Sequence, residues 1–171
     1  EIEFSSGHID CPIVAVTGTN GKTTVTEATS EMLRESGIDA PTAGNIGTPL
    51  ADFASETHDL LVVEVSSFQL RFTETFHPVA AAITNVAEDH LDWHGSVFSY
   101  RDAKAKVFHN QGPEDLLVYD ADDPGAAGLV SSARSRMYPT SGVRLAPDGG
   151  GVAGGVIHAL DVEIEIASLR N

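Results

Sequence analysis

The chain has few basic residues and a single cysteine. Its 171 residues include 10 Lys and Arg against 25 Asp and Glu, which gives a formal net charge of −15 at pH 7. Nucleic-acid binding rests on clustered Lys and Arg, so this composition argues against a nucleic-acid partner. Cys11 cannot form an internal disulfide, which fits a reducing cytoplasm. Any anionic ligand must be bound locally, by backbone amides, one or two lysines and bound cations.

The sequence also lacks a long apolar run. No stretch approaches the roughly 18 uninterrupted apolar residues of a membrane helix, and residues 1–4 carry no signal-peptide pattern. We therefore expect a cytoplasmic protein that does not bind membranes. Apolar residues make up 42% of the chain, enough to form the core of one domain. Ordinary sequence runs to both ends, so we expect residues 1–171 to be one domain of a longer polypeptide.

Short β-rich segments alternate with helical patterns, which is typical of parallel strands joined by helical crossovers. The predicted class is α/β, with a mostly parallel sheet flanked by helices. Val25, Ala28, Met32 and Leu33 would form the buried face of the first helix. The predicted strands span residues 13–17, 60–65, 80–85 and 116–119, and the predicted helices span 23–36 and 97–109.

The amino-acid composition changes after about Gly142. Residues 147–155 are rich in glycine and have no strand before them and no helix after them, so we expect a surface turn rather than a ligand loop. Residues 162–166 alternate with period two, which predicts a small C-terminal β-hairpin region.

A glycine-rich turn lies between the first predicted strand and the first predicted helix. Its glycines let the backbone approach a ligand closely, and the helix N-terminus attracts a phosphate. Lys22 can reach the β and γ phosphates of a nucleotide, and Thr23 offers a hydroxyl to Mg²⁺. A structural turn that happens to hold two glycines and a lysine is the alternative, but strand, turn, Lys-Thr pair and helix occur here in order. The predicted nucleotide-binding residues are Gly18, Thr19, Asn20, Gly21, Lys22, Thr23 and Thr24.

Polar residues follow two further predicted strands. Glu64 ends one of them, and residues 85–92, which include His90, follow another. Ligands gather at the carboxyl ends of strands in such sheets, where a carboxylate is a suitable Mg²⁺ ligand. Solvated surface charge is the alternative for these acids, and a satisfied polar residue is the alternative for His90. Nothing in the residues alone selects Lys104.

Taken together, these motifs resemble the Mur ligase family. The resemblance rests on the Gly-Thr-Asn-Gly-Lys-Thr-Thr loop at 18–24, on Glu64 followed by two serines, on residues 88–92, and on Tyr100-x-x-Ala103-Lys104. It covers about residues 1–123 and is specific as a set. Within the family, Gly44-Asn45-Ile46-Gly47 and Ser66-Ser67-Phe68-Gln69-Leu70 resemble the D-glutamate-adding ligases. A diaminopimelate- or lysine-adding ligase is the alternative.

The resemblance implies an ATP-dependent amide-bond ligase of peptidoglycan precursor synthesis. ATP would phosphorylate the carboxylate of UDP-N-acetylmuramoyl-L-alanine, and the amine of D-glutamate would attack the acyl phosphate. It implies that Lys22 and the loop bind ATP and that Lys22, His90 and Lys104 serve catalysis. Thr23 and Glu64 would hold one Mg²⁺, while His90 and a carbamylated Lys104 would hold a second. Asn45, Ser66 and Gln69 would contact the muramoyl-alanine substrate.

The family pattern also includes an N-terminal domain for the uridine nucleotide and a C-terminal domain for the amino acid. Neither fits in this sequence, so we expect the isolated domain to be inactive. Two other functions stay open: a nucleotide-binding module that does not catalyse, and a small P-loop kinase or NTPase. Glu64, His90 and Lys104 argue against the first. The scattered arginines argue against the second, because a kinase lid would bring them to the phosphates.

Overall fold

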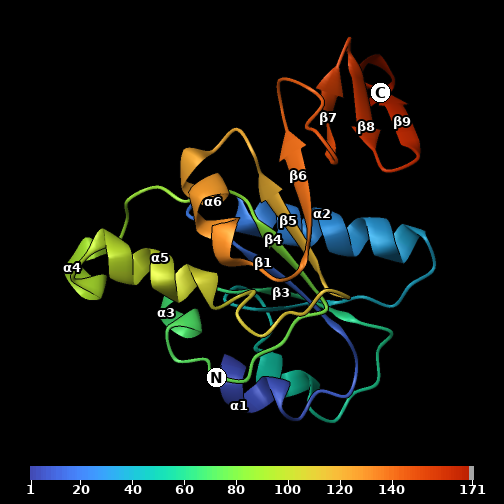
Figure 1. Cartoon of the computed structure of the whole chain (residues 1–171). Helices are drawn as coiled ribbons and strands as arrows, with labels where there is room; N and C mark the ends of the chain where they lie inside the picture. Colours follow the sequence, from blue (N-terminus) through green and yellow to red (C-terminus); the bar gives the residue numbers. More distant parts are fainter. Residues whose placement is uncertain (170–171) are drawn as a thin grey trace.

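The computed structural model describes residues 1–169, and its centre is a nine-stranded sheet with helices on both faces (Figure 1). The strand order is β2-β3-β1-β4-β5-β6-β7-β8-β9; the pairs from β2 to β7 are parallel, and the last two pairs are antiparallel. The strands are β1 Ile13–Thr17, β2 Thr42–Gly44, β3 Leu61–Glu64, β4 Ala80–Ile83, β5 Leu116–Asp120, β6 Arg136–Ser141, β7 Gly150–Ala153, β8 Val156–Ala159 and β9 Val162–Glu165.

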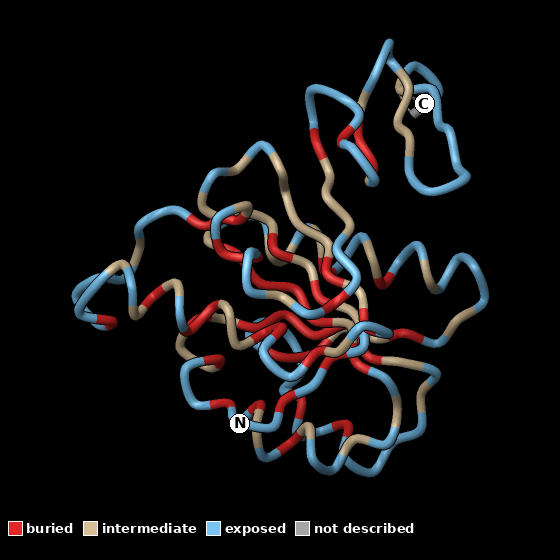
Figure 2. Tube along the Cα trace, in the orientation of Figure 1, coloured by how far each residue is buried: buried red, intermediate tan, exposed pale blue. Residues whose placement is uncertain are grey.

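The helices form two layers, one on each side of the central strands. Side chains of a strand alternate between faces, so neighbours such as Ala15 and Val16 pack in different cores. The larger core lies beneath α5 and α6, and the smaller one lies beneath α2 (Figures 1 and 2). The helices are α1 Ile2–Ser6, α2 Lys22–Glu35, α3 Ser67–Leu70, α4 Leu91–His94, α5 Val97–Ala105 and α6 Pro124–Leu129, with short 3₁₀ turns η1 Leu50–Phe53, η2 Val130–Ser132 and η3 Ile166–Leu169.

The predicted α/β class is confirmed, as are the four predicted strands within one or two residues at their ends. The predicted buried face of α2 is partly wrong. Met32 is 63% exposed and Ala28 is exposed as well, while Thr26 and Ser30 are buried. Ser30 Oγ donates to the carbonyl of Ala40 at 2.6 Å, so this helix approaches its neighbour through small polar residues that a hydrophobic pattern does not mark. Val25 and Leu33 pack at the smaller core as expected.

Two further boundaries differ from prediction. Helix α5 ends at Ala105, and residues 106–110 form turns instead of continuing the helix to 109. The glycine-rich segment is only partly a surface turn, because Gly150–Ala153 forms β7. A Cβ on Gly149 would lie 1.9 Å from the carbonyl oxygen of Pro139, so glycine permits this close pairing with β6. The predicted C-terminal hairpin is confirmed as β8 and β9, which extend the main sheet through β7.

The N-terminal helix is fastened to the rest of the domain by carboxylates. The Glu3 carboxylate accepts hydrogen bonds from the backbone amides of residues 74–76 and from the Thr75 hydroxyl. Burial pushes the pKa of Glu3 upward, but these hydrogen bonds outweigh it and hold the pKa below its usual value. An acidic side chain can therefore stabilise this domain by accepting backbone hydrogen bonds, in addition to giving it negative charge.

The carboxyl ends of the central parallel strands meet at one edge of the sheet. Val16 of β1 pairs with Glu64 of β3, and Gly44 of β2 pairs with the same residue. Thr17 pairs with Ile83 of β4. The segments that follow β1, β2, β3 and β4 therefore emerge together, as expected for a ligand site in a parallel α/β sheet.

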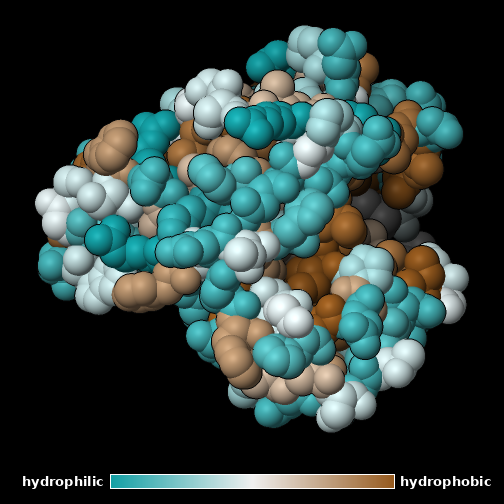
Figure 3. Space-filling view, turned by 60° about the horizontal axis from the view of Figure 1, so that its bottom comes forward, coloured by the Kyte–Doolittle hydropathy of each residue, from teal (hydrophilic) through white to brown (hydrophobic). Residues whose placement is uncertain are grey.

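The surface of the domain is mainly hydrophilic on the face that Figure 3 draws, where hydrophobic residues gather in a hollow. Among residues 1–169, no helix is long and apolar enough to cross a membrane.

Candidate functional site

The turn between β1 and α2 has the geometry of a phosphate-binding loop. Gly21 occupies the N-cap of α2 with φ of 79°, in the left-handed region that favours glycine. A Cβ on Gly18 would lie 1.8 Å from Thr84 Oγ1, so only glycine fits where the loop passes β4. Asn20, Gly21 and Thr24 are exposed at the N-terminal end of α2. The loop thus presents to an anion the N-terminus of α2, where the first amides of the helix have no partner within the helix.

Thr23, Glu64 and Asn45 form a hydrogen-bonded group beside this loop. The Thr23 hydroxyl donates to Glu64 Oε2 at 2.7 Å, and the Asn45 side-chain amide donates to Glu64 Oε1 at 2.9 Å. The Asn45 backbone amide also donates to the Glu64 carbonyl at 2.9 Å. Glu64 is only 2% exposed, yet both of its carboxylate oxygens have partners. The three residues come from α2, from β3 and from the loop after β2, and hydrogen bonds join them.

This group fits a magnesium ion. Mg²⁺ prefers oxygen ligands and is commonly held by one or two carboxylates together with substrate phosphates. The Thr23 hydroxyl and the Glu64 carboxylate supply such oxygens next to the phosphate loop. Asn45 fixes the carboxylate, a role that the sequence did not indicate. No group of three or more His, Cys, Asp or Glu side chains suited to a metal occurs within residues 1–169, so an ion here would complete its coordination with phosphate and water.

Two lysines lie against the carbonyl groups of the phosphate loop. Lys22 Nζ donates to the carbonyl of Thr19 at 3.0 Å, and its side chain is partly exposed. Lys104 Nζ, on α5, donates to the carbonyl of Gly18 at 2.7 Å and lies 4.9 Å from the centre of the Tyr100 ring. The structure thus brings Lys104 to the loop although it is 82 residues from Lys22 in the sequence.

Lys104 is an unusual lysine because it is 1% exposed. Burial, followed by repulsion from Lys22, lowers the pKa of Lys104 to about 7, against an opposing attraction from Asp89. A substantial fraction of this side chain is therefore a neutral amine at neutral pH. A neutral amine is the form that reacts with carbon dioxide to give a carbamate, so the environment suits the carbamylation that the family resemblance implies.

His90 lies at the start of α4 in a strained backbone conformation, with φ of 50° and ψ of 35°. Its backbone amide donates to Asp89 Oδ1 at 2.8 Å, and its ring packs 4.7 Å from the Phe68 ring. About half of the His90 side chain is exposed. Such strain in a non-glycine residue is often found at functional sites. No direct contact joins His90 to Lys104 in the described chain, so their shared metal site stays a prediction.

The predicted substrate residues Ser66 and Gln69 form the N-terminal capping box of α3. Gln69 Oε1 accepts from the Ser66 amide at 3.0 Å and from the Ser66 hydroxyl at 2.9 Å. The Gln69 side-chain amide is directed to Glu1, with Nε2 to Oε2 at 3.3 Å. These contacts explain the position of both residues without a ligand, and their contact with substrate stays a prediction.

His94 belongs to the site region, although the sequence interpretation did not select it. It is 5% exposed, its Nε2 lies 3.0 Å from Ser67 Oγ, and its ring packs against Phe68 and Tyr100. Burial is the largest cause that lowers the pKa of His94, followed by the charge of Arg71. In the sequence, its spacing of four residues from His90 and its place just before Gly95 could have marked His94 as part of the site. The His94 ring therefore packs against Phe68, the same ring against which His90 packs.

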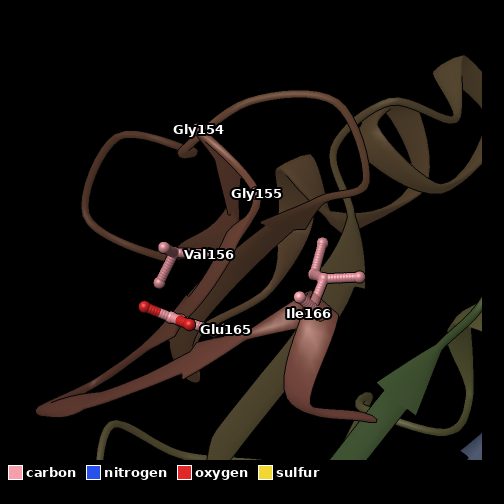
Figure 4. A pocket seen from close by; sticks show the side chains of 6 residues that line it. Gly154, Gly155, Val156, Glu165 and Ile166 are labelled. Carbon is pink, nitrogen blue, oxygen red and sulfur yellow. The ribbon is translucent and has the colours of Figure 1, made fainter. Parts of the chain in front are cut away.

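One pocket away from these residues has few groups that could bind a ligand. Figure 4 shows a pocket of about 530 Å³ lined by Gly154, Gly155, Val156, Glu165, Ile166 and Ala167. The pocket lies beside β8, and four strands of the sheet, β4 to β7, separate β8 from the phosphate-loop strand β1. Glu165 is its only charged side chain. The convergent polar groups at the carboxyl edge of β1, β2, β3 and β4 therefore define the candidate site.

The chain is similar in sequence to proteins of one family. The family model described as the Mur ligase middle domain matches residues 16–144. The UDP-N-acetylmuramoylalanine–D-glutamate ligase of Pelotomaculum thermopropionicum is 43% identical over 161 residues, which cover 93% of this chain and 35% of that protein. The enzyme of the same name from Bifidobacterium adolescentis is 50% identical over 123 residues, which cover 71% of this chain and 25% of that protein. The chain thus spans about a third or less of these relatives.

Solved structures share the fold. A UDP-N-acetylmuramoyl-L-alanyl-D-glutamate–2,6-diaminopimelate ligase superposes with a TM-score of 0.70 at 22% identity, covering 90% of this chain and 38% of that one. The MurF ligase of Thermotoga maritima in complex with ADP gives a TM-score of 0.69 at 19% identity, covering 95% and 42%. The match over residues 16–144, together with the phosphate loop and the buried Glu64, shows that the chain belongs to the Mur ligase family as a middle domain.

Proposed function

We propose that the chain is the ATP-binding domain of a cytoplasmic ligase that joins D-glutamate to UDP-N-acetylmuramoyl-L-alanine in peptidoglycan precursor synthesis. The observation that carries the proposal is the pairing of the phosphate loop with buried Glu64 through Thr23, in a chain 43–50% identical to two ligases of that name. Domains that bind the uridine nucleotide and the amino acid would lie outside these 171 residues, which match only 35% and 25% of those two ligases. The isolated domain would therefore lack the means to hold both substrates in attack geometry.

In the proposed reaction, the carboxylate of UDP-N-acetylmuramoyl-L-alanine attacks the γ-phosphorus of ATP and releases ADP. The amine of D-glutamate then attacks the acyl carbon, and an amide forms as phosphate leaves and the nitrogen loses a proton. No step needs a nucleophilic side chain from the protein. The site must neutralise charge and hold the reacting groups in line, which suits a loop of amides and a lysine.

Different residues would bind the phosphates, the metal ions and the substrate. The loop at residues 18–24 would hold the phosphates through Lys22 and through the amides of residues 21–24 at the N-terminus of α2. Thr23 and Glu64 would hold one Mg²⁺, which would neutralise charge on the phosphate oxygens. His90 and carbamylated Lys104 would hold a second, and the carbamate would turn a cation that repels the metal into an anion that attracts it. Asn45, Ser66 and Gln69 would face the muramoyl-alanine substrate.

Phosphate release by the full-length protein tests this function. We expect ATP-dependent phosphate release only when UDP-N-acetylmuramoyl-L-alanine and D-glutamate are both present, with formation of the amide product seen by mass spectrometry. Diaminopimelate or lysine, each with the precursor that already carries D-glutamate, would support release if the alternative ligase were correct. Phosphate release without any acceptor would indicate an NTPase. Binding of ATP with no release under any condition would indicate a module that does not catalyse.

A further inference from the structure

The segment after β4 is bonded to the phosphate loop along one side. Thr84 Oγ1 donates to the Asn20 carbonyl at 2.7 Å. The side-chain amide of Asn85 donates to the same carbonyl at 3.0 Å, and its oxygen accepts from the Asn20 amide at 2.9 Å. The Ala87 amide donates to Thr19 Oγ1 at 3.0 Å. Residues 84–90, which we call the bracket loop, lie outside helices and strands, so such bonds determine its shape.

The other side of the bracket loop is held by one carboxylate oxygen. Asp123 Oδ1 accepts from the Val86 amide at 2.9 Å and from the Ala126 amide at 2.7 Å. The second of these bonds caps the N-terminus of α6, so Asp123 joins that helix to the bracket loop. Val86 lies between Asn85 and Ala87, the two residues whose contacts with the phosphate loop are described above. A shift of Val86 would therefore move both contacts.

Close packing at Gly125 also fixes the contact between α6 and the bracket loop, which we call the junction. A Cβ on Gly125 would lie 1.8 Å from the Val86 carbonyl oxygen, which has no room to move toward the helix. Arg101 Nη2, from α5, donates to the Gly125 carbonyl at 3.2 Å. Helix α5 carries Lys104 one turn further along. The junction thus links the bracket loop, which carries His90, to the helix that carries Lys104.

We propose that Asp123 is a positioning residue: through Val86 it holds the bracket loop against the phosphate loop and so sets the place of the phosphate-binding amides and of His90. Asp123 would act through its bonds to the Val86 and Ala126 amides and not through a contact with nucleotide or metal. The inference rests on the proposed function, because it assigns the bracket loop to the ATP and Mg²⁺ site of that reaction.

Kinetics of the full-length enzyme test the inference through three variants. Asp123→Ala removes the acceptor and should lower kcat/KM for ATP by about tenfold to about a hundredfold, since a displacement of roughly 1 Å can cost that much. The Mg²⁺ concentration for half-maximal rate should rise, and the KM for D-glutamate should stay unchanged. Asp123→Asn keeps Oδ1 as an acceptor and should restore near-normal values. Asp122→Ala is the matched control, because that carboxylate binds Ser141 and Gly142 instead.

A second pair of variants, one that crowds the junction and one control, tests the inference if Asp123→Ala does not fold. Gly125→Ala adds a methyl group against the Val86 carbonyl and should raise the KM for ATP and the Mg²⁺ requirement. Gly142→Ala is the control, because its Cβ would meet nothing within 4 Å, so it should behave as wild type. Alanine favours helix over glycine, so a loss in Gly125→Ala would come from the contact with the bracket loop and not from a weaker helix.

The outcomes separate this inference from the proposed function. If the wild-type enzyme makes no amide, the proposed function fails before any variant is compared. If it is active and Asp123→Ala matches wild type in ATP and Mg²⁺ dependence, the inference is overturned while the function stands. The inference is equally overturned if Asp122→Ala and Asp123→Ala lose activity to the same extent, or if Gly125→Ala and Gly142→Ala do.

Discussion

Replacing Lys104 with methionine should change how the stability of the domain depends on pH. Lys104 is 1% exposed, and burial, followed by Lys22, lowers its pKa to about 7 in the folded state, against the 10.5 of a free lysine. Between these two values the unfolded chain binds a proton that the folded chain does not. The free energy of unfolding must then rise with pH across that window, and this contribution becomes constant below the folded pKa.

The size of the effect follows from the two pKa values. A single site with these constants raises the free energy of unfolding by about 2 kcal/mol between pH 7 and pH 9. Lys104→Met keeps the length of the side chain and removes the titrating group, so it should lack this increment. Methionine also avoids the cost of burying a charge below pH 7, which offsets part of the lost hydrogen bond to Gly18.

Urea unfolding at pH 7 and pH 9 measures the difference. We expect the wild-type protein to gain about 2 kcal/mol relative to Lys104→Met over this range. Lys106→Met is the control, because Lys106 follows the same helix but its Nζ bonds to the carbonyls of Arg71 and Thr73 near the surface. That variant should retain the pH dependence of the wild type. Parallel curves for wild type and Lys104→Met would refute the depressed pKa and, with it, the argument for a reactive neutral amine.

Three further predictions concern the site in the full-length enzyme. Lys22→Ala should lower turnover at least about a hundredfold, the loss typical of one preorganised charge contact, and near-normal turnover with an intact fold would contradict its role. Lys104→Arg should be almost inactive because guanidinium forms no carbamate, and removing carbon dioxide and bicarbonate should reversibly inactivate the wild type; an active arginine variant would disprove carbamylation. Gly18→Ala should abolish calorimetric ATP binding, because its Cβ would overlap Thr84 Oγ1, whereas Gly142→Ala, with nothing within 4 Å, should bind normally.

The sequence predicted β1, β3, β4 and β5 well because each is a short, mostly apolar run. Strands β2 and β6 were missed for physical reasons. β2 is three residues long and ends in Gly44, and β6 contains Pro139 between polar and charged residues, so neither has a hydrophobic run. Both are fixed by pairing with strands distant in sequence, which local patterns do not report.

The candidate site was predictable where a motif is continuous in the chain. The phosphate loop and Glu64 could be placed from a strand, a turn and a strand end, and the structure joins them through Thr23. Lys104 required the family resemblance, because its burial depends on the packing of α5 against the loop. Asp123 lies in a polar segment that resembles ordinary surface. Only the folded chain shows that its carboxylate faces Val86.

The carboxylates that accept backbone hydrogen bonds have a consequence for redesign of the protein's charge. A chain with a net charge of −15 invites substitutions that reduce acidity, for example to alter its behaviour on ion exchange or its crystallisation. The acids are not interchangeable for this purpose. Glu3 accepts hydrogen bonds from residues 74–76, and Asp123 accepts from the bracket loop and from the first turn of α6, so replacing either with a residue that lacks the oxygen removes an acceptor. Glu35, exposed at the end of α2, is a safer position at which to exchange a negative charge for a positive one.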